Sequence, residues 1–437
     1  MHPKALMDAC TELVRQVLKF DHAADAVVSQ FFKQHRNSLG LGPRERFVLS
    51  GAVYNVLRHK LLFDHLSPSG SGPKERRMAI LGWAHHLDQP DHTNGASPGS
   101  KEFLRSALSE PEKRWLEQCA AIDRSALLER HRHNLPEWLV TSLKAQLSER
   151  FWDYVTALNR PQSLDLRVNA FLYKRSEAQA MLAKERIASE PTAFSPWGLR
   201  LPAKTNVTDS EAFAKGAVEV QDEGSQLLAL LVDAKRGEMV VDFCAGAGGK
   251  TLALGAGMRN TGRLYAMDTS AHRLDGLKPR LARSGLSNVH PVAIAHERDE
   301  RIKRLSGKVD RVLVDAPCTG LGTLRRSPDL KWRQNPEQVQ QAALLQNAIL
   351  DSAARLLKTG GRLVYATCST MVEENEAVAE AFGQRHPQWV PMSVQAVLTD
   401  LKVDKASQLC AHNGLYLRMW PHLQGTDGFF AAVWHAP

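Results

Sequence analysis

Hydrophobic and polar positions divide the 437-residue chain into three stretches. Over residues 1–125, apolar residues recur at helical spacing and no convincing strand pattern occurs, so we expect an all-helical domain there. Residues 130–220 mix both patterns and predict a small α+β subdomain. From residue 221 to residue 437, strand and helix patterns alternate, which is typical of a doubly wound α/β sheet. The expected fold class is therefore α/β, with two smaller parts ahead of the main sheet.

Individual elements can be placed within the second and third stretches. In the second we expect a helix over 137–158, a strand over 164–169 and a helix over 176–185. In the third, strands are expected near 238–242, 263–268, 289–294, 310–315 and 361–367. Between the last two strands, Asn335 can cap a helix that has Pro336 in its first turn, and Gly360 and Gly361 end it.

The first stretch has three features of its own. Residues 1–20 predict an amphipathic helix interrupted by Asp8 and Glu12, unlike a secretory signal. The turn-rich residues 89–100 predict a mobile loop inside the domain. Basic residues surround an apolar run over 47–57, which fits either an RNA-facing surface or a solvated helix face. These basic residues are Arg44, Arg46, Arg58 and Lys60.

The composition is that of a soluble globular protein, since 43% of the residues are hydrophobic and 24% are charged. No apolar run approaches the roughly 20 residues needed to cross a bilayer. We therefore expect a cytoplasmic protein, monomeric and without membrane association. The net charge of +9 is compatible with nucleic acid as a partner, and equally with an ordinary basic protein.

The six cysteines form no C-x-x-C pair, so zinc or iron–sulfur ligation is not expected and no metal is predicted. Cys10, Cys119 and Cys410 lie in ordinary contexts and are predicted to be small core residues. Two others follow predicted strands, in the strings Asp315-Ala316-Pro317-Cys318 and Thr367-Cys368-Ser369. Because ligands and catalytic groups gather at the carboxyl ends of strands in open α/β sheets, these two thiols predict thiol chemistry on a substrate.

A glycine-rich turn follows the first strand of the third stretch and opens a helix. Its residues are Cys244, Ala245, Gly246, Ala247, Gly248, Gly249 and Lys250. Glycines let a ligand approach the backbone, and a helix N-terminus favours negative charge. Asp268 ends the next strand, where an acid hydrogen-bonds ribose hydroxyls. A P-loop would need glycine in place of Cys244, whereas a dinucleotide, S-adenosylmethionine or a tight turn without ligand all stay open.

With these motifs, the chain resembles the Nop/Sun family of RNA cytosine-5 methyltransferases, and most closely its bacterial RsmB-like members, which act on 16S rRNA. The matching segments are 242–245, 248–251, 315–320, 365–369, 167–169, 220–223 and 427–430. The resemblance is firm from about residue 130, and the N-terminal helices look like a NusB-type RNA-binding domain. It implies a Rossmann-like domain over 221–437 that uses S-adenosylmethionine to methylate C5 of a cytosine in RNA, with 16S rRNA as the expected partner.

The resemblance also implies roles for three residues at the strand ends. Cys368 would add to C6 of the cytosine and make C5 nucleophilic. Cys318 would act in product release, and Asp315 would hydrogen-bond the N3/N4 edge of the base. Basic and aromatic residues after Cys318 are expected to hold phosphates and stack a base. These are Arg325, Arg326, Lys331, Trp332 and Arg333.

The implied cofactor-binding residues are Cys244, Ala245, Gly246, Ala247, Gly248, Gly249, Lys250, Asp268, His296 and Asp315. Lys250 would bind the cofactor carboxylate. The chain departs from the family pattern at two places. Gly246 and Ala247 replace an Ala-Pro pair, which keeps the glycines and is compatible with binding. His296, with Glu297 beside it, stands where the family has a third-strand acid that contacts the adenosine end.

Two other functions compete with this interpretation. In a DNA cytosine-5 methyltransferase, Cys318 would be the nucleophile and Cys368 would have no role; the Thr-Cys-Ser motif and the helical N-terminal domain argue against it. A non-catalytic RNA-binding or ribosome assembly factor would be indicated by loss of a catalytic cysteine or of Asp315, and all three residues are present.

Overall fold

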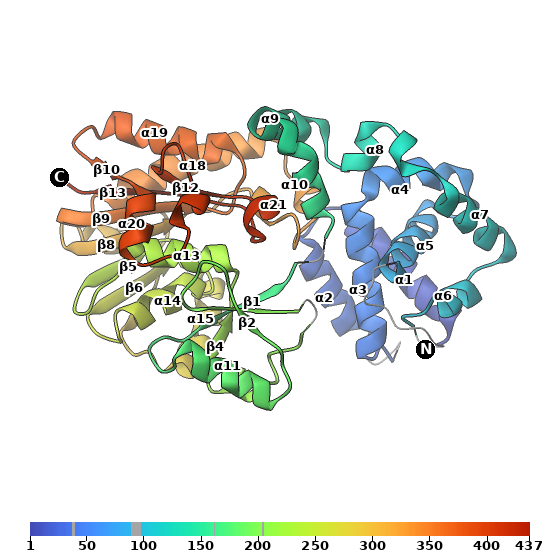
Figure 1. Ribbon diagram of the computed structural model, residues 1–437, viewed down its shortest axis with the longest axis horizontal. Helices are drawn as coiled ribbons and strands as arrows, with labels where there is room; N and C mark the ends of the chain where they lie inside the picture. Colours follow the sequence, from blue (N-terminus) through green and yellow to red (C-terminus); the bar gives the residue numbers. More distant parts are fainter. Residues whose placement is uncertain (37–39, 89–97, 161, 203–204) are drawn as a thin grey trace. The chain divides into compact units, whose positions relative to one another are not determined.

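The chain forms two structural units in the computed structural model, which describes residues 1–36, 40–88, 98–160, 162–202 and 205–437 (Figure 1). The first unit consists of residues 1–159 and 326–335, and the second of residues 160–325 and 336–437. The boundary at residue 159 lies inside residues 130–220, the stretch that we predicted to form a separate subdomain. Most of the loop predicted at 89–100 lies outside the described residues.

The first unit is built from helices packed around α1, α3 and α5, whose inward faces bury Leu13, Leu49 and Trp83. Its elements are α1 (Pro3–Val17), α2 (Ala24–Gln34), α3 (Pro43–Arg58), α4 (Lys60–Leu66), η1 (Ser67–Ser69), α5 (Lys74–Leu87), α6 (Lys101–Ala107), α7 (Glu110–Ala121), η2 (Arg124–Ala126), α8 (Glu129–His133), α9 (Glu137–Leu147), η3 (Ser148–Arg150), α10 (Phe151–Leu158) and α17 (Leu330–Arg333). The single helix predicted over 137–158 is broken because Ser148 has a φ of +47°, a left-handed conformation that a helix cannot contain.

The second unit begins with a four-stranded antiparallel sheet in the order β2-β3-β1-β4. Its elements are β1 (Leu164–Val168), α11 (Arg175–Lys184), β2 (Glu190–Pro191), β3 (Gly198–Leu201), α12 (Glu211–Ala214) and β4 (Val218–Val220). Leu166, Leu182 and Leu199 form its core and are fully buried. The predicted strand and second helix of this stretch therefore match the structure closely.

A nine-stranded sheet forms the centre of the second unit, in the order β11-β12-β13-β9-β8-β5-β6-β7, with β10 also paired to β13. Its strands are β5 (Met239–Asp242), β6 (Arg263–Asp268), β7 (Val289–Ala293), β8 (Val309–Asp315), β9 (Leu357–Thr367), β10 (Val390–Met392), β11 (Cys410–Ala411), β12 (Tyr416–Met419) and β13 (Phe429–His435). Neighbours among β5 to β9 are parallel, whereas β13 pairs antiparallel with β9. The five predicted strands correspond to β5 to β9, and the predicted α/β fold class is confirmed.

Helices cover both faces of this sheet (Figure 1). The helices of this part of the chain are α13 (Glu223–Val232), α14 (Gly249–Gly257), α15 (Ala271–Ser284), α16 (Glu300–Lys303), η4 (Leu321–Thr323), α18 (Pro336–Ala354), η5 (Val372–Glu374), α19 (Glu376–Arg385), α20 (Val394–Asp400), η6 (Ala406–Leu409) and α21 (Pro421–Gln424). Strand residues alternate between the faces. Val240 and Val364 pack against α13, α14, α15 and α20, whereas Val241 and Tyr365 pack against α18 and α19. Both faces of the sheet are therefore covered by apolar side chains, as is typical of parallel sheets.

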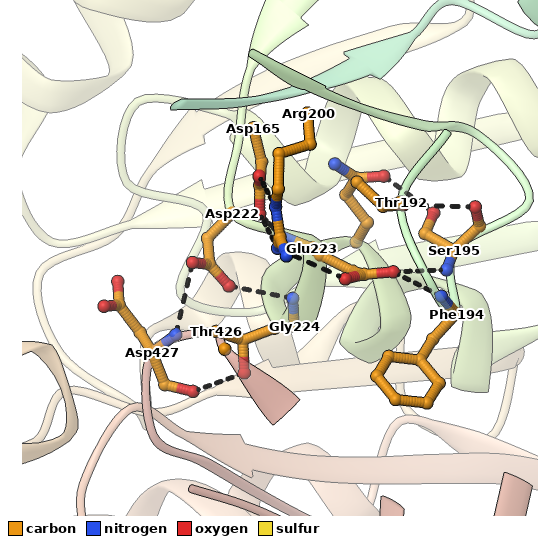
Figure 2. Close-up of polar contacts among 12 residues, drawn as sticks. Asp165, Thr192, Phe194, Ser195, Arg200, Asp222, Glu223, Gly224, Thr426 and Asp427 are labelled. Carbon is orange, nitrogen blue, oxygen red and sulfur yellow. Dashed lines mark hydrogen bonds and ion pairs between the residues drawn. The ribbon is translucent and has the colours of Figure 1, made fainter. Parts of the chain in front are cut away.

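A buried polar cluster fastens the small sheet to α13 and to the segment before β13 (Figure 2). Arg200 donates two hydrogen bonds to Asp165, of 2.8 and 2.9 Å. Glu223 is fully buried and accepts the backbone N–H groups of Phe194 at 2.5 Å and of Ser195 at 2.8 Å. These contacts satisfy carboxylates that would otherwise be costly to bury.

Candidate active site

The candidate site residues lie at the carboxyl ends of four parallel strands. Asp242, Asp268 and Asp315 end β5, β6 and β8, and Thr367 ends β9. The strand order reverses between β5 and β8. On one side of β5 the sheet continues with β6 and β7, and on the other side it continues with β8 and β9. Ligands bind at such a switch point in open α/β sheets.

The two thiols of the predicted motifs meet at this edge. The Sγ atoms of Cys318 and Cys368 are 3.4 Å apart, and both side chains are partly exposed. Gly322 fixes the loop after Cys318, because its N–H donates to the carbonyl of Cys368 at 2.9 Å and its carbonyl accepts from the N–H of Gly428 at 2.8 Å. A Cβ on Gly322 would lie 2.2 Å from the Gly428 carbonyl oxygen, so only glycine fits.

The charges around the thiols are paired. Lys250 Nζ lies 2.7 Å from Asp315 Oδ2. Burial lowers the pKa of Lys250, but the charge of Asp315 and the hydrogen bond to it outweigh burial and raise this pKa overall. The hydrogen bond with Cys368, burial and the charges of Cys368 and Glu374 raise the pKa of Cys318 well above its usual value. Lys250, expected to bind the cofactor carboxylate, thus pairs with the acid expected to bind the base.

The glycine loop leaves part of its backbone open to a ligand. Asp268 accepts the N–H of Gly246 at 2.8 Å and that of Ser270 at 2.7 Å, which fixes the carboxylate beside the loop. Gly246 has a φ of +54° and open space where a side chain would lie, so a ligand can approach the backbone there. Gly248, with a φ of +82°, packs against Leu277 instead, because a Cβ there would lie 2.1 Å from Leu277 Cδ1.

The other loop residues have structural partners. The N–H of Ala245 donates to Met267 at 2.8 Å, the carbonyl of Ala247 accepts from Arg280 at 2.6 Å, and α14 begins at Gly249. Burial raises the pKa of Cys244 well above its usual value. The loop therefore offers a rigid backbone surface at the start of a helix.

Asp242, which ends β5, is fully enclosed beneath this loop. Its carboxyl accepts a hydrogen bond of 2.7 Å from the Thr251 hydroxyl. Burial raises the pKa of Asp242 to about 7 despite that hydrogen bond, and the charges of Asp315 and Asp268 add to the shift.

His296 lies just beyond β7 and is exposed. Its Nδ1 accepts the N–H of Arg298 at 3.1 Å, a bond that an aspartate carboxylate also makes in a tight turn. Asp299 accepts two further N–H groups of the same loop, at 2.8 Å each. The loop shape is thus maintained although the expected acid is absent.

Part of the basic segment after Cys318 is not free for RNA. Lys331 is buried and donates to the carbonyl of Arg58 at 2.8 Å, and the indole of Trp332 donates to that of Leu57 at 2.7 Å. Burial lowers the pKa of Lys331 well below its usual value. The expectation that Lys331 holds a phosphate is therefore wrong, because its side chain is buried inside the helical unit. The edge of the Trp332 ring is engaged in the same unit.

Glu374 is a site residue that the sequence patterns did not indicate. Its side chain is fully buried and contacts the residue that follows each cysteine. It stands in the polar string Glu373-Glu374-Asn375-Glu376. No signal in this sequence distinguishes it from the neighbouring acids.

Within the described residues, no group of three or more histidine, cysteine or acidic side chains could hold a metal ion. In the same part of the chain, the helices are too short or too polar to cross a membrane.

The doubly wound sheet, the glycine loop and Asp268 at its switch point define the class, an enzyme that binds a ribose-containing cofactor such as S-adenosylmethionine. Comparisons with known proteins give the family. The model of 16S rRNA methyltransferase RsmB/F matches residues 229–435, and that of the RsmF/B-like ferredoxin-like domain matches residues 135–208. The chain belongs to the RsmB/F family of methyltransferases.

Relatives and solved structures agree with this assignment. The chain is 30% identical to a probable ribosomal RNA small subunit methyltransferase B of Synechocystis sp. over 96% of its length and 97% of the relative's. It is 33% identical to the ribosomal RNA small subunit methyltransferase B of Pseudomonas putida over 77% of its own length and 73% of that protein's. The crystal structure of PH0851 matches with a TM-score of 0.77 and 27% identity over 99% of both chains. A methyltransferase homolog protein from Pyrococcus horikoshii matches with a TM-score of 0.61 and 26% identity over 72% of this chain and 100% of that one.

Proposed function

We propose that the protein methylates C5 of a cytosine in 16S rRNA through a covalent bond between Cys368 and C6 of the base. The observation that carries this proposal is the 3.4 Å separation of Cys318 and Cys368 at the sheet edge that also bears the cofactor loop. A second thiol beside the nucleophile serves a reaction that must both form and break a carbon–sulfur bond. We further propose that the enzyme acts in the cytoplasm as a monomer.

The reaction begins at Cys368. Its thiolate adds to C6 and pushes electron density onto C5, which then accepts the methyl group that S-adenosylmethionine supplies when bound. Asp315, held by Lys250 at 2.7 Å, accepts a hydrogen bond from the exocyclic amine of the base and keeps the ring in place. The loop at Gly246 and Asp268 would hold the cofactor.

Release needs a base for the C5 proton. The contact with Cys368 is the largest cause that raises the pKa of Cys318. Once Cys368 is bonded to C6 it carries no negative charge, so Cys318 ionises more easily and loses its proton to solvent. The Cys318 thiolate then takes the C5 proton, the C5–H electrons restore the C5–C6 double bond, and the C6–S bond breaks to return Cys368 as a thiolate.

The family favours this function over its competitors. The relatives' names specify ribosomal RNA and not DNA, and a DNA enzyme would leave Cys368 idle beside the nucleophile. A non-catalytic assembly factor would not need two thiols and an aspartate kept together at the cofactor edge.

The test is transfer of labelled methyl from S-adenosylmethionine to 16S rRNA that lacks the modification. We expect Cys368→Ala to abolish transfer, and Cys318→Ala to leave protein covalently attached to RNA as a slow band in a denaturing gel. Cys410→Ala, which removes a thiol far along the chain, is the control and should act like the wild type. An active Cys368→Ala enzyme together with an inactive Cys318→Ala enzyme that forms no adduct would show that the assigned roles are wrong.

A further inference from the structure

Glu374 connects the two loops that carry the thiols. It ends η5, and its side chain is fully buried. Its Oε1 accepts the N–H of Thr319 at 2.8 Å, and its Oε2 accepts the hydroxyl of Thr319 at 2.5 Å and that of Ser369. Thr319 directly follows Cys318, and Ser369 directly follows Cys368. One carboxylate therefore joins both cysteine loops.

Neighbouring side chains hold Glu374 in this position. Gln346, on α18, donates to Glu374 Oε1 at 3.1 Å and to the carbonyl of Pro317 at 3.0 Å. The Tyr365 hydroxyl donates to the backbone carbonyl of Glu374 at 2.5 Å. The Glu374 carboxylate thus receives hydrogen bonds from Thr319, Ser369 and Gln346 and donates none, which is the arrangement that stabilises a buried negative charge.

The two thiols experience opposite charges. The charge of Glu374 acts on Cys318 and is one cause that raises its pKa, after the contact with Cys368 and burial. Lys250 interacts electrostatically with Cys368, and this interaction contributes to the raised pKa of Lys250. A negative neighbour disfavours a thiolate and a positive neighbour favours one. The fixed charges therefore distinguish two sulfur atoms that are only 3.4 Å apart.

We propose that Glu374 is the positioning residue of the thiol pair: it ties the two cysteine loops together and, through its buried negative charge, makes Cys318 the less reactive of the two thiols. Glu374 touches neither base nor cofactor in this role and acts through the cysteines. The inference rests on the proposed function for the meaning of the pair, but its tests need neither RNA nor cofactor.

The first test measures which thiol reacts. The folded protein is treated with iodoacetamide, and the alkylation rate of each cysteine is followed by mass spectrometry. In the wild type, we expect Cys368 to react roughly tenfold faster than Cys318, because the negative charge of Glu374 disfavours the thiolate of Cys318. Glu374→Gln keeps the volume and removes the charge, so the ratio should fall toward one as Cys318 gains reactivity. The exposed neighbour provides the control, Glu373→Gln, which should leave the ratio unchanged.

The second test measures how close the sulfur atoms stay. Diamide oxidises two adjacent thiols to a disulfide and is itself reduced to a hydrazine. At 3.4 Å the pair should cross-link quickly in the wild type. Glu374→Ala removes the hydrogen bonds to Thr319 and Ser369, so we expect roughly tenfold slower cross-linking, compared at a temperature at which both proteins are folded.

The outcomes separate this inference from the proposed function. An unchanged alkylation ratio in Glu374→Gln overturns the inference, whether or not the enzyme methylates RNA. If Glu374→Ala does not fold, the alkylation ratio of Glu374→Gln still decides whether the inference holds. An alkylation ratio that falls toward one in Glu374→Gln supports the inference even if the enzyme does not methylate 16S rRNA. Absence of methyl transfer would count against the proposed function alone.

Discussion

Arg200→Leu should open the small sheet of the second unit. Arg200 is the cation of a cluster in which Asp165 and Glu223 have fully buried side chains (Figure 2). It binds Asp165 at 2.8 Å and reaches Glu223 at 3.5 Å. Leucine fills similar space but leaves two buried carboxylates without a positive charge.

The size of the effect follows from this burial. Removing one partner of a buried ion pair costs roughly 3–5 kcal/mol, because the remaining charge stays out of water. The Arg200 side chain is 30% exposed, so water can reach Asp165 after the substitution and the lower end of the range, about 3 kcal/mol, applies. Since about 1.36 kcal/mol corresponds to a factor of ten, the local opening equilibrium should rise roughly 150-fold.

Amide hydrogen exchange measures that opening directly. The reporter is the β1–β3 pairing, for example the N–H of Val168, which donates to Trp197 at 2.8 Å. We expect peptides that span β1 and β3 to exchange faster, and peptides of the helical unit to be unchanged. Arg200→Leu combined with Asp165→Asn removes both charges of the closer pair and should recover part of the protection, because Glu223 keeps its two backbone N–H donors. This reasoning would be refuted if Arg200→Leu changed the exchange rate of these peptides by less than fivefold. It would also be refuted if the double variant were no better protected than Arg200→Leu.

Two further predictions concern the active site and the helical unit. Gly322→Ala places a methyl group 2.2 Å from the Gly428 carbonyl oxygen and should lower methyl transfer at least about tenfold. The control is Gly383→Ala, whose Cβ meets nothing within 4 Å and which should melt no lower than the wild type. Equal methyl transfer by both variants would contradict the close fit at Gly322. Burial lowers the pKa of His85 and of His133 to about 4, so the folded unit excludes protons that the unfolded chain binds below a pKa of about 6.5. Its stability should be full above pH 6.5 and fall as the pH drops toward 4, and a melting temperature constant from pH 7.5 to 5 would rule this out.

The main sheet could be predicted from the sequence because its strands are buried on both faces. Such strands form short apolar runs between turn residues, and the run at 263–268 coincides with β6. The break between α9 and α10 could not be predicted in the same way. Ser148 has a left-handed φ without being glycine, so tertiary packing decides a conformation for which the local sequence has no signal.

Part of the candidate site could also be predicted. Asp268, Cys318 and Cys368 follow strands, and the ends of parallel strands converge whatever the rest of the chain does. Glu374 has no such constraint. Its burial depends on donors that come from three separate segments, through Thr319, Gln346 and Ser369. A carboxylate of this kind is recognised only when its partners are seen.

The segment 326–335 shows why charge patterns misled the prediction about RNA contacts. Asp329 accepts the N–H of Ala24 at 3.1 Å, at the start of α2, where the residue before the helix provides no side-chain cap. Lys331 and Trp332 donate to the last carbonyls of α3. An acid at a helix N-terminus matches the helix dipole, and N–H donors at a C-terminus satisfy its last carbonyls. The segment therefore satisfies the ends of two helices about 300 residues away in sequence, and such distant backbone groups compete with phosphates for the same basic and aromatic side chains.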